Sequence, residues 1–488
     1  MSTIQRTKRI RLVPYFLIWI QGFVLLAFVA LWIKSGETLT AHLISVFILL
    51  QFVWSLWSWK VATGNFFDPY TIFLVAAYLF NGGKAILEVF RLNEGGIETF
   101  ISNDGYVIFS FSTDTITHAL ALVFIGLGSL HFGALLAASR GRRTWETLVQ
   151  PTAKSAKASR QVGWFLLSIS FLPMVITVVD KYQVVMQAGY FGLFQRTPAT
   201  GFGNLPQVLA SFMVPGVLFL LAGSRGSPSL LALSTLIILM YSLVQAFTGT
   251  RLWWAMPLVS YVWLWHRRIS LIPKIFLWVG AAVIGFVVFP SIMAVRNLPG
   301  TERLSLYTFI QGFLSLQNPI IAILREMAGT LLVVAHTLEL IPAVRDFDFG
   351  LGYLYSILTV FPNFFWEIHP TVARGLYAHW LTYIISPATF YAGGGYGFSF
   401  IAEAYANFGW GGIPVVVGLI GFLLAKFVLW GEKTNDPAKS AAVAAFLAFF
   451  LIYARGETAL VVRPLIWYAL APYLLTRLLP KIFVRRSS

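Results

Sequence analysis

The sequence predicts an all-α integral membrane protein with about 12 transmembrane helices. Of its 488 residues, 58% are hydrophobic and only 11% are charged, whereas soluble domains are about 45–50% apolar and about 25% charged. Apolar runs of about 18 residues or more, the length that crosses a hydrocarbon core, recur along the chain. Stretches within them, such as LFLLAGS and AAVIGFVVF, are continuous, which favours helices over the alternating strands of a membrane barrel.

Basic clusters orient the predicted helices, because loops rich in lysine and arginine face the cytoplasm. The segment 139–160, the pair Arg267 and Arg268, and the tail after residue 480 all fall on one side when the helix count is even. We therefore expect a multi-pass protein of the bacterial inner membrane with both termini in the cytoplasm. The helices are expected at 13–33, 39–59, 70–90, 114–138, 162–180, 207–223, 229–248, 252–266, 271–293, 409–430, 441–454 and 464–480.

The long interval between the ninth and tenth predicted helices divides the chain into three parts. Residues 1–293 carry helices 1–9 with short loops, and 409–488 carry helices 10–12 and a cytoplasmic tail. The interval 294–408 lies on the periplasmic side in this topology. It is too long for a structureless loop and contains moderately apolar pieces, so we expect short helices there.

Several partners and cofactors are not expected. The net charge of +16 resides largely in the short segments between apolar runs, and no aromatic-and-basic motif of a nucleic-acid binder appears. The chain has no cysteine, which excludes disulfides and cysteine-ligated metals. His336, His369 and His379 lie in the long interval without an HExxH motif or a DxD-like acidic pair, so neither a metal nor another cofactor is expected.

Arginine is the basic residue that this interval uses. Between 295 and 408 there is no lysine, and the arginines are Arg296, Arg303, Arg325, Arg345 and Arg374. The planar guanidinium grips phosphate through two hydrogen bonds and stays charged when partly buried. The alternative interpretation is that these arginines pair with the carboxylates of the same interval or extend to the membrane surface.

Two further segments place arginines at the edges of apolar helices. Arg251 occurs in AFTGTRLWWAMP, and Arg455, Glu457 and Arg463 occur in FFLIYARGETALVVRPLIWY. Ionisable residues at such positions are costly and usually functional, although an interfacial anchor is the alternative. Arg455 and Arg463 are about two helical turns apart, so a helical hairpin could bring them to one ligand.

A glycine-rich segment leads into the tenth helix. It reads YAGGGYGFSFIAEAYANFGWGGIPVVVGLIGFLL, residues 391–424. A glycine loop that precedes a helix start can bind an anion through backbone amides. Ser399 and Glu403 are four residues apart and share one face of this helix.

Together these patterns resemble the O-antigen polymerase family, the Wzy-type oligosaccharide repeat-unit polymerases. The resemblance rests on G-T-R at a helix start, the long loop, the glycine-aromatic segment with Glu403, Tyr405, Asn407 and F-G, and A-R-G-E before the last helix. It covers about 247–253, 359–425 and 453–465 in motif and most of the chain in topology. It implies a GT-C-like polymerase/ligase architecture with a large helical periplasmic loop before the last three helices.

The resemblance also implies a substrate and a reaction. Such enzymes are glycosyltransferases. They transfer a growing glycan from an undecaprenyl-pyrophosphate-linked oligosaccharide donor to a similar acceptor, at the periplasmic face of the membrane. Because no metal-ligand pattern is present and the arginines can supply positive charge, we expect this one to need no metal. Besides the donor, the acceptor and membrane lipid, a chain-length regulator and a flippase are candidate partners. The implied product is O-antigen or a related surface polysaccharide, as in lipopolysaccharide biosynthesis.

The expected site residues follow from that reaction. The leaving pyrophosphate needs stabilisation of its negative charge. We assign that role to Arg251, Arg455, Arg463, Arg296 and Arg374. Glu403 is the first choice for a base and His379 the second, with Arg251 also counted as catalytic. The sugar-binding candidates are Tyr396, Tyr405, Trp380 and Asn407.

Two other functions remain as alternatives. An O-antigen ligase would share the lipid donor, the topology and the arginines, but the G-T-R and Y-x-N-F-G patterns favour the polymerase. A lipid-linked glycan transporter would show internal repeats and broken helices at mid-membrane, and neither is evident in the sequence.

Overall fold

The structure, a computed structural model, describes residues 3–35, 39–101, 107–139, 153–195, 201–248, 251–295, 306–316, 318–363, 366–432 and 434–485. These residues are almost entirely helical, with one small antiparallel sheet of β1 (Thr99–Ile101) and β2 (Val107–Ser110). Within the described ranges, 12 helical segments are long and apolar enough to cross a membrane. The predicted all-α membrane class is confirmed.

The helices follow one another through the whole chain. The first half contains α1 (Thr3–Ser35), α2 (Ala41–Thr63), α3 (Pro69–Val89), α4 (Thr113–Ser139), α5 (Ala153–Ala188), α6 (Leu205–Ala210), α7 (Met213–Gly223), α8 (Pro228–Phe247), α9 (Arg251–Arg268), α10 (Lys274–Val283) and α11 (Phe289–Val295). The second half contains α13 (Leu306–Leu314), α14 (Pro319–Met327), α15 (Thr330–Leu340), α16 (Leu351–Leu358), α17 (Pro370–Arg374), α18 (Tyr377–Ile385), α19 (Pro387–Tyr391), α20 (Phe400–Glu432), α21 (Pro437–Phe450), α22 (Val462–Pro464) and α23 (Ala471–Arg485).

Shorter turns complete the backbone. They are the 3-10 turns η2 (Tyr190–Leu193), η3 (Gly201–Asn204), η5 (Leu451–Arg455) and η6 (Thr458–Leu460), and the π-helical turns η4 (Ile284–Val288) and η7 (Leu465–Leu470). The last two lie inside otherwise continuous helices, where they link α10 to α11 and α22 to α23.

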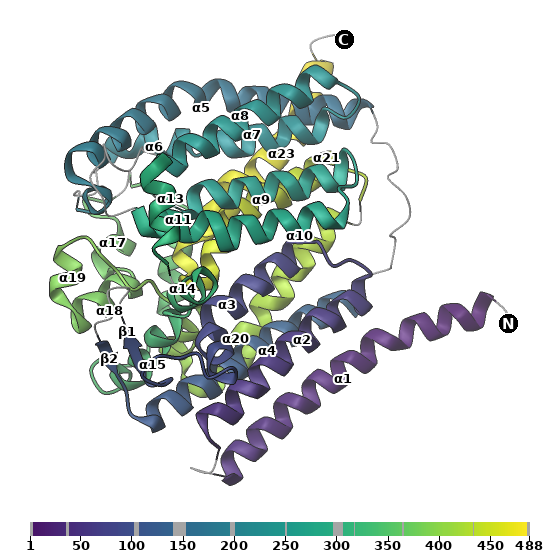
Figure 1. Ribbon diagram of the computed structural model, residues 1–488. Coiled ribbons are helices and arrows are strands. Elements are labelled where there is room, and N and C mark those ends of the chain that lie inside the picture. Colours follow the sequence, from purple (N-terminus) through teal and green to yellow (C-terminus); the bar gives the residue numbers. More distant parts are fainter. Residues whose placement is uncertain are drawn as a thin grey trace.

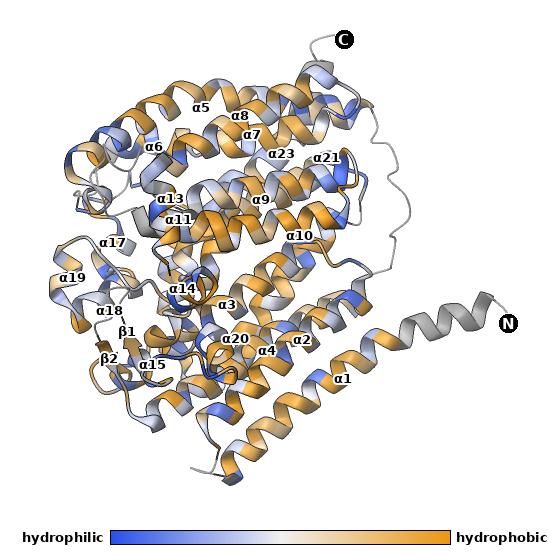
Figure 2. Cartoon of the chain, viewed as in Figure 1, coloured by the Kyte–Doolittle hydropathy of each residue, from blue (hydrophilic) through white to orange (hydrophobic). Residues whose placement is uncertain are grey.

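The long helices pack in two groups (Figure 1). Helices α1 to α4 pack with α20, and α5 to α9 pack with α21 and α23. The most enclosed spans are α4 and α21, with 89% and 83% of their most apolar stretches buried. By contrast, Trp19, Phe23 and Leu26 on α1 are 78%, 71% and 72% exposed, and Figure 2 shows apolar residues along the peripheral helices. Such an exposed apolar surface is stable in contact with hydrocarbon.

The two ends of the bundle differ. Helix α1 begins and α23 ends at the same end, here named the tail end, while α15, α17, α18 and α19 lie at the opposite end, named the loop end (Figure 1). The interval 294–408 folds into the expected short helices, α13 to α19, within its described residues.

All but one of the predicted spans coincide with an apolar helix long enough to cross a membrane. The exception is 252–266, which is the helix α9 in the bundle but carries three arginines at its ends. A further apolar stretch that was not predicted, Pro319–Leu340, falls in the loop interval and consists of the two helices α14 and α15. The helix predicted at 409–430 begins earlier, at Phe400.

Close contact between α4 and α20 holds the first group together. A Cβ atom on Gly133 would lie 1.8 Å from the carbonyl oxygen of Gly418, and one on Gly421 would lie 1.9 Å from that of Leu130. Only glycine lets the two backbones approach this closely, as is common where membrane helices cross. This crossing holds the part of α20 around Gly418 and Gly421 against α4.

Helix α20 is broken at Gly409, where φ is 64° and ψ is −159°. This conformation is essentially restricted to glycine. The break removes helical partners from the carbonyl groups that precede it. Two loop amides replace them: the N–H of Asp348 donates to Ala406 O at 3.0 Å, and that of Phe349 donates to Asn407 O at 2.9 Å. The break in α20 therefore binds the 348–349 segment and positions Asp348.

Candidate functional site

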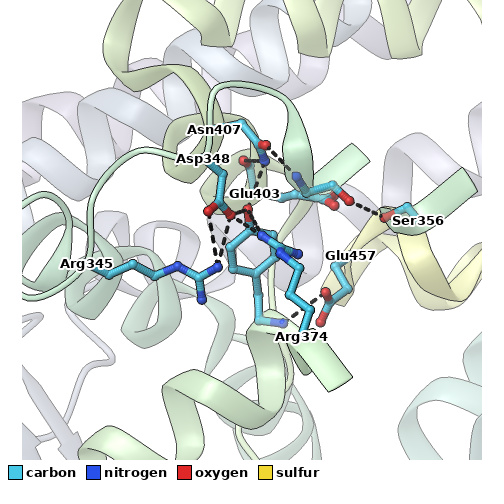
Figure 3. A network of polar contacts seen from close by, with 9 residues as sticks. Arg345, Asp348, Ser356, Arg374, Glu403, Asn407 and Glu457 are labelled. Atoms are coloured by element: carbon cyan, nitrogen blue, oxygen red, sulfur yellow. Dashed lines mark hydrogen bonds and ion pairs between the residues drawn. The ribbon is translucent and has the colours of Figure 1, made fainter. Parts of the chain in front are cut away.

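Asp348 lies at the centre of a polar cluster at the loop end (Figure 3). Its carboxylate accepts hydrogen bonds from Arg345 at 3.0 and 3.2 Å, from Arg374 Nη2 and from the Tyr377 hydroxyl. The side chains of Asp348, Arg374 and Arg345 are only 14%, 16% and 21% exposed. One carboxylate is thus shared by two guanidinium groups that are largely shielded from water.

Aromatic rings cover both of these guanidinium groups. Arg345 lies over the rings of Tyr377 and Trp380 at 4.9 and 5.0 Å, and Arg374 lies over those of Tyr355 and Tyr377 at 5.2 and 4.9 Å. Cation–π contacts of this kind add to the ion pair. The two arginines are therefore held by protein groups on several sides.

Glu403 lies in the first turn of α20 and is fully buried. Its Oε2 accepts hydrogen bonds from Thr458 N at 2.8 Å and Thr458 Oγ1 at 2.7 Å. Its Oε1 is also buried and has no hydrogen-bond partner among the described residues. A buried carboxylate oxygen without a partner is costly, so this atom requires an explanation beyond anchoring Thr458.

Glu457 is the second buried carboxylate of this region, and its side chain binds the backbone at the N-terminus of α18. Its two oxygens accept hydrogen bonds from the N–H groups of Tyr377 and Ala378, both at 3.0 Å. Burial raises the pKa of Glu457 to about 7, although these two donors and the charges of Arg374 and Arg345 oppose the rise. Glu457 therefore ties the segment before the last helix to α18.

Asn407 connects α20 to α16. It receives a hydrogen bond on Oδ1 from Gly352 N at 3.1 Å, and its Nδ2 donates to Glu403 O at 2.8 Å and to the Tyr377 hydroxyl at 3.1 Å. Both polar atoms of its buried amide are therefore used by the protein. The structure gives Asn407 a positioning role, and its predicted contact with sugar stays a prediction.

Arg463 is held differently from the Asp348 cluster. Its Nε donates to the Thr359 carbonyl at 2.6 Å, and its guanidinium lies 5.9 Å from the Trp467 ring centre. The side chain is half-buried. Among the described residues, no carboxylate forms an ion pair with it and no acceptor binds its two terminal nitrogens.

Arg455 packs against the glycine-rich segment. Its guanidinium lies 5.6 Å from the Phe80 ring centre, and a Cβ on Gly397 would lie 3.4 Å from its Nη2. Gly397 has φ of 74°, a region that favours glycine. The chain from Arg455 to Arg463 consists of short turns instead of the expected helical hairpin, so the two arginines lie against different partners.

The start of α20 is enclosed by protein groups. Ser399 Oγ donates to Asn81 Oδ1 at 2.7 Å and accepts from Ile401 N at 3.2 Å, and Asn81 Nδ2 donates to Ala454 O at 2.8 Å. Ser399 is fully buried. Ser399 therefore caps one amide at the start of α20, and the anion site predicted for the glycine loop stays a prediction.

The structure separates the remaining candidates. His379 is exposed on α18 and faces Phe390, with ring centres 6.2 Å apart, so it does not join the buried cluster. Tyr405 is buried and donates to Ile341 O at 3.3 Å. The ring of Tyr396 contacts that of Phe109. Trp380 lies under Arg345.

Three arginines of the sequence analysis lie at least partly outside the described residues. These are Arg296 and Arg303, and the side chain of Arg251, whose backbone begins α9. Their assignments stay predictions. In the described part of the chain no three His, Asp or Glu side chains gather as metal ligands do, and metal independence also stays a prediction.

Sequence reasoning did not select Asp348 and Tyr377, which organise the cluster. The spacing of Arg345 and Asp348, three residues apart, was an available signal for a local ion pair. No local signal indicated that Arg374, 26 residues further on, would share the same carboxylate. Glu457 was noted only as a neighbour of Arg455.

The fold and site define a multi-pass membrane protein that buries acidic and basic side chains together at one end of its helices. The family O-antigen polysaccharide polymerase Wzy matches residues 12–487, so the chain belongs to this family and the predicted resemblance is confirmed. The activity at this level is polymerisation of lipid-linked oligosaccharide repeat units, a glycosyltransferase-type reaction. Comparison with curated proteins and with solved structures gives no match.

Proposed function

We propose that the chain transfers a growing glycan from an undecaprenyl-pyrophosphate donor to a sugar hydroxyl of an acceptor repeat unit, at the periplasmic face of the bacterial inner membrane. The acceptor oxygen forms the new bond to the anomeric carbon, and the bond from that carbon to the phosphate oxygen breaks. The electron pair leaves with the lipid pyrophosphate, and the hydroxyl proton passes to Glu403. The single observation that carries this assignment is the unpartnered, buried Oε1 of Glu403.

Glu403 has the features of a base that is held in place. Thr458 binds Oε2 through two hydrogen bonds and leaves Oε1 available for a proton. A positioned carboxylate of this kind contributes about 100- to 10,000-fold to a proton-transfer step. Because Glu403 is fully buried, the acceptor hydroxyl reaches it only when the segments packed around it separate.

Arg463 is the proposed contact for the leaving pyrophosphate. Its Nε is anchored on Thr359 O, which fixes the plane of the guanidinium and leaves two terminal nitrogens for phosphate oxygens. Arg455 is the second candidate. Arg374 instead shares the Asp348 carboxylate with Arg345, so it is already held in an ion pair, and its predicted role as a phosphate ligand is not carried into this proposal.

The distribution of basic residues supports the proposed orientation. Arg268 donates to Thr434 O and Asp436 O at the tail end, between α20 and α21, and exposed Lys157 begins α5 at the same end. By the positive-inside rule, the tail end is cytoplasmic and the loop end periplasmic. The chain has no cysteine, so an impermeant maleimide should not label Lys157→Cys in intact cells. Labelling of this variant would show that the tail end faces the periplasm, which contradicts the proposed orientation.

The test of the base uses Glu403→Gln. Glutamine keeps an oxygen that can accept both Thr458 hydrogen bonds but cannot take the proton. We expect polymerisation of purified lipid-linked repeat units to slow at least about 100-fold, with normal membrane abundance. Glu339→Gln, a partly exposed carboxylate at the loop end, is the matched control and should keep the wild-type ladder. A wild-type ladder from Glu403→Gln would exclude this residue as the base.

The ligase alternative predicts a different glycan profile. In a strain that lacks the gene, loss of a polymerase leaves single repeat units attached to the lipid core. Loss of a ligase leaves free polymer that never reaches the core. The family match favours the first outcome.

A further inference from the structure

Helix α16 carries Tyr353, whose hydroxyl no described residue binds. The Tyr353 hydroxyl is buried and has no hydrogen-bond partner within the described ranges. Its ring stacks on Phe408 of α20, with ring centres 6.3 Å apart and planes at 12°. Phenylalanine would make the same stack without burying a polar atom, so the packing does not explain the hydroxyl.

Three polar groups near Tyr353 on α16 have partners. Gly352 N donates to Asn407 Oδ1 at 3.1 Å, Ser356 Oγ donates to Gly352 O at 2.8 Å, and Tyr355 O accepts from Thr371 Oγ1 at 2.8 Å. The unpartnered phenol is therefore not the result of a poorly packed helix. It lies on a helix whose neighbouring groups at Gly352, Tyr355 O and Ser356 do have partners.

Tyr353 and Glu403 lie in the same part of the site. Asn407 links them, because it binds the backbone of Gly352 with one amide atom and that of Glu403 with the other. Burial raises the pKa of Tyr353 well above its usual value, and the nearby Glu403 carboxylate adds to the rise. Tyr353 thus remains a protonated donor at neutral pH, in the same part of the site as the Glu403 carboxylate.

The pairing of a donor with an acceptor suits a carbohydrate. Each sugar hydroxyl can donate one hydrogen bond and accept others, and neighbouring hydroxyls on a ring lie close enough to reach two protein groups. Two buried polar atoms left without partners in one small region are rare in proteins. A substrate hydroxyl pair would satisfy both.

We propose that Tyr353 binds the acceptor sugar by donating a hydrogen bond to the hydroxyl oxygen next to the hydroxyl that Glu403 deprotonates. This inference rests on the proposed role of Glu403. It adds a substrate class: the acceptor residue carries a free hydroxyl adjacent to the one that becomes glycosylated. Tyr353 is then a specificity residue, and the proton transfer itself remains with Glu403.

The test is Tyr353→Phe in the full-length protein, with a synthetic lipid-linked acceptor and with its analogue that lacks the neighbouring hydroxyl. Loss of one neutral hydrogen bond should lower kcat/KM for the normal acceptor about 3- to 10-fold. With the deoxy analogue, Tyr353→Phe and wild type should be equal, because the contact is already missing. Thermal stability should be unchanged or higher, since the variant removes an unpartnered buried hydroxyl.

Tyr261→Phe is the matched control. This tyrosine is also buried, but its hydroxyl contacts Ser234 and Thr235 between α8 and α9, and the variant should keep wild-type kcat/KM. Equal kcat/KM for Tyr353→Phe and wild type on the normal acceptor would overturn the inference while the role of Glu403 stands. If Glu403→Gln is fully active, the proposed base fails, whatever Tyr353→Phe does.

Discussion

The loop end holds arginines in two contrasting environments. Arg345 and Arg374 share the Asp348 carboxylate and lie over aromatic rings, whereas Arg463 is fixed by one backbone carbonyl and has no ion pair in the described part of the chain. The first arrangement uses the arginine charge to hold the loop on α20. The second leaves charge available for a ligand. An arginine-rich loop is therefore not by itself a phosphate site.

The charges around Asp348 support this distinction. Two buried carboxylates, Glu403 and Glu457, lie near the two guanidinium groups, which lower the pKa of Glu457 against the effect of burial. Both guanidinium groups are already paired with Asp348, so the cluster offers less free charge to a pyrophosphate than Arg463 does. The comparison predicts that changes at Arg463 affect rate, while changes in the Asp348 cluster affect stability.

The largest expected effect is at Arg463. Both Arg463→Ala and Arg463→Lys should slow polymerisation about 100- to 1000-fold, because the donor that stabilises leaving-group charge is lost and lysine lacks the planar fork. Membrane abundance and melting temperature should stay near wild type. The measurement is the chain-length ladder with protein abundance in parallel. A normal ladder from Arg463→Lys would assign this residue to an interfacial anchor.

Arg325→Ala is the control for this comparison. Arg325 lies on α14 and pairs with Glu94, which is 64% exposed, and such pairs contribute at most about 1 kcal/mol. We expect a wild-type ladder. Arg267 lies in a basic cluster at the end of α9, where a substitution would be expected to have no effect on polymerisation. It donates to Glu432 O at the end of α20, so it is less suitable as a control.

Asp348→Asn should mainly reduce stability. Asparagine keeps an acceptor but leaves Arg345 and Arg374 without their shared negative charge in a poorly hydrated site. Breaking a buried ion pair costs about 3 kcal/mol or more, so the thermal unfolding temperature in detergent should fall clearly. If Asp348→Asn melts like wild type while Arg463→Ala is destabilised, the two environments have been assigned the wrong way round.

Glu457 gives a smaller, pH-dependent effect. Its pKa of about 7 lies above the ordinary 4.5, so the unfolded chain ionises first and stability falls as pH rises between these values. Between about pH 5.5 and about pH 8, ionisation of Glu457 should lower the free energy of unfolding by about 2 kcal/mol. Above that range the loss is complete.

Thermal unfolding of wild type and Glu457→Gln across this pH range measures the effect. The stability of wild type relative to the variant should decrease with increasing pH. An opposite slope would mean that the N–H groups of Tyr377 and Ala378 and the two arginines outweigh burial and hold Glu457 ionised.

Much of the fold could be predicted from the sequence, but less of the site. Predicted spans such as 114–138 and 441–454 match α4 and α21 closely, because a long apolar run can be recognised from the sequence of that segment alone. Glu403 was chosen as a candidate base from its place after a glycine-rich segment at a helix start; the structure buries it, and its role stays a prediction. Asp348 and Tyr353 were not chosen, because neither stands in a recognisable motif.

The sequence by itself determined that this is a helical membrane protein, because the transfer of each residue into hydrocarbon depends mainly on its own side chain and on backbone hydrogen bonds within its own helix. It also carried the motifs that identify the family. Only the tertiary structure decided which arginines are neutralised and which polar atoms lack partners. Asp348, Arg374, Glu403 and Glu457 are far apart in the chain, and their interaction depends on distance in space. The break at Gly409 contributes to this arrangement, because the carbonyl groups before it bind the backbone at Asp348 and Phe349.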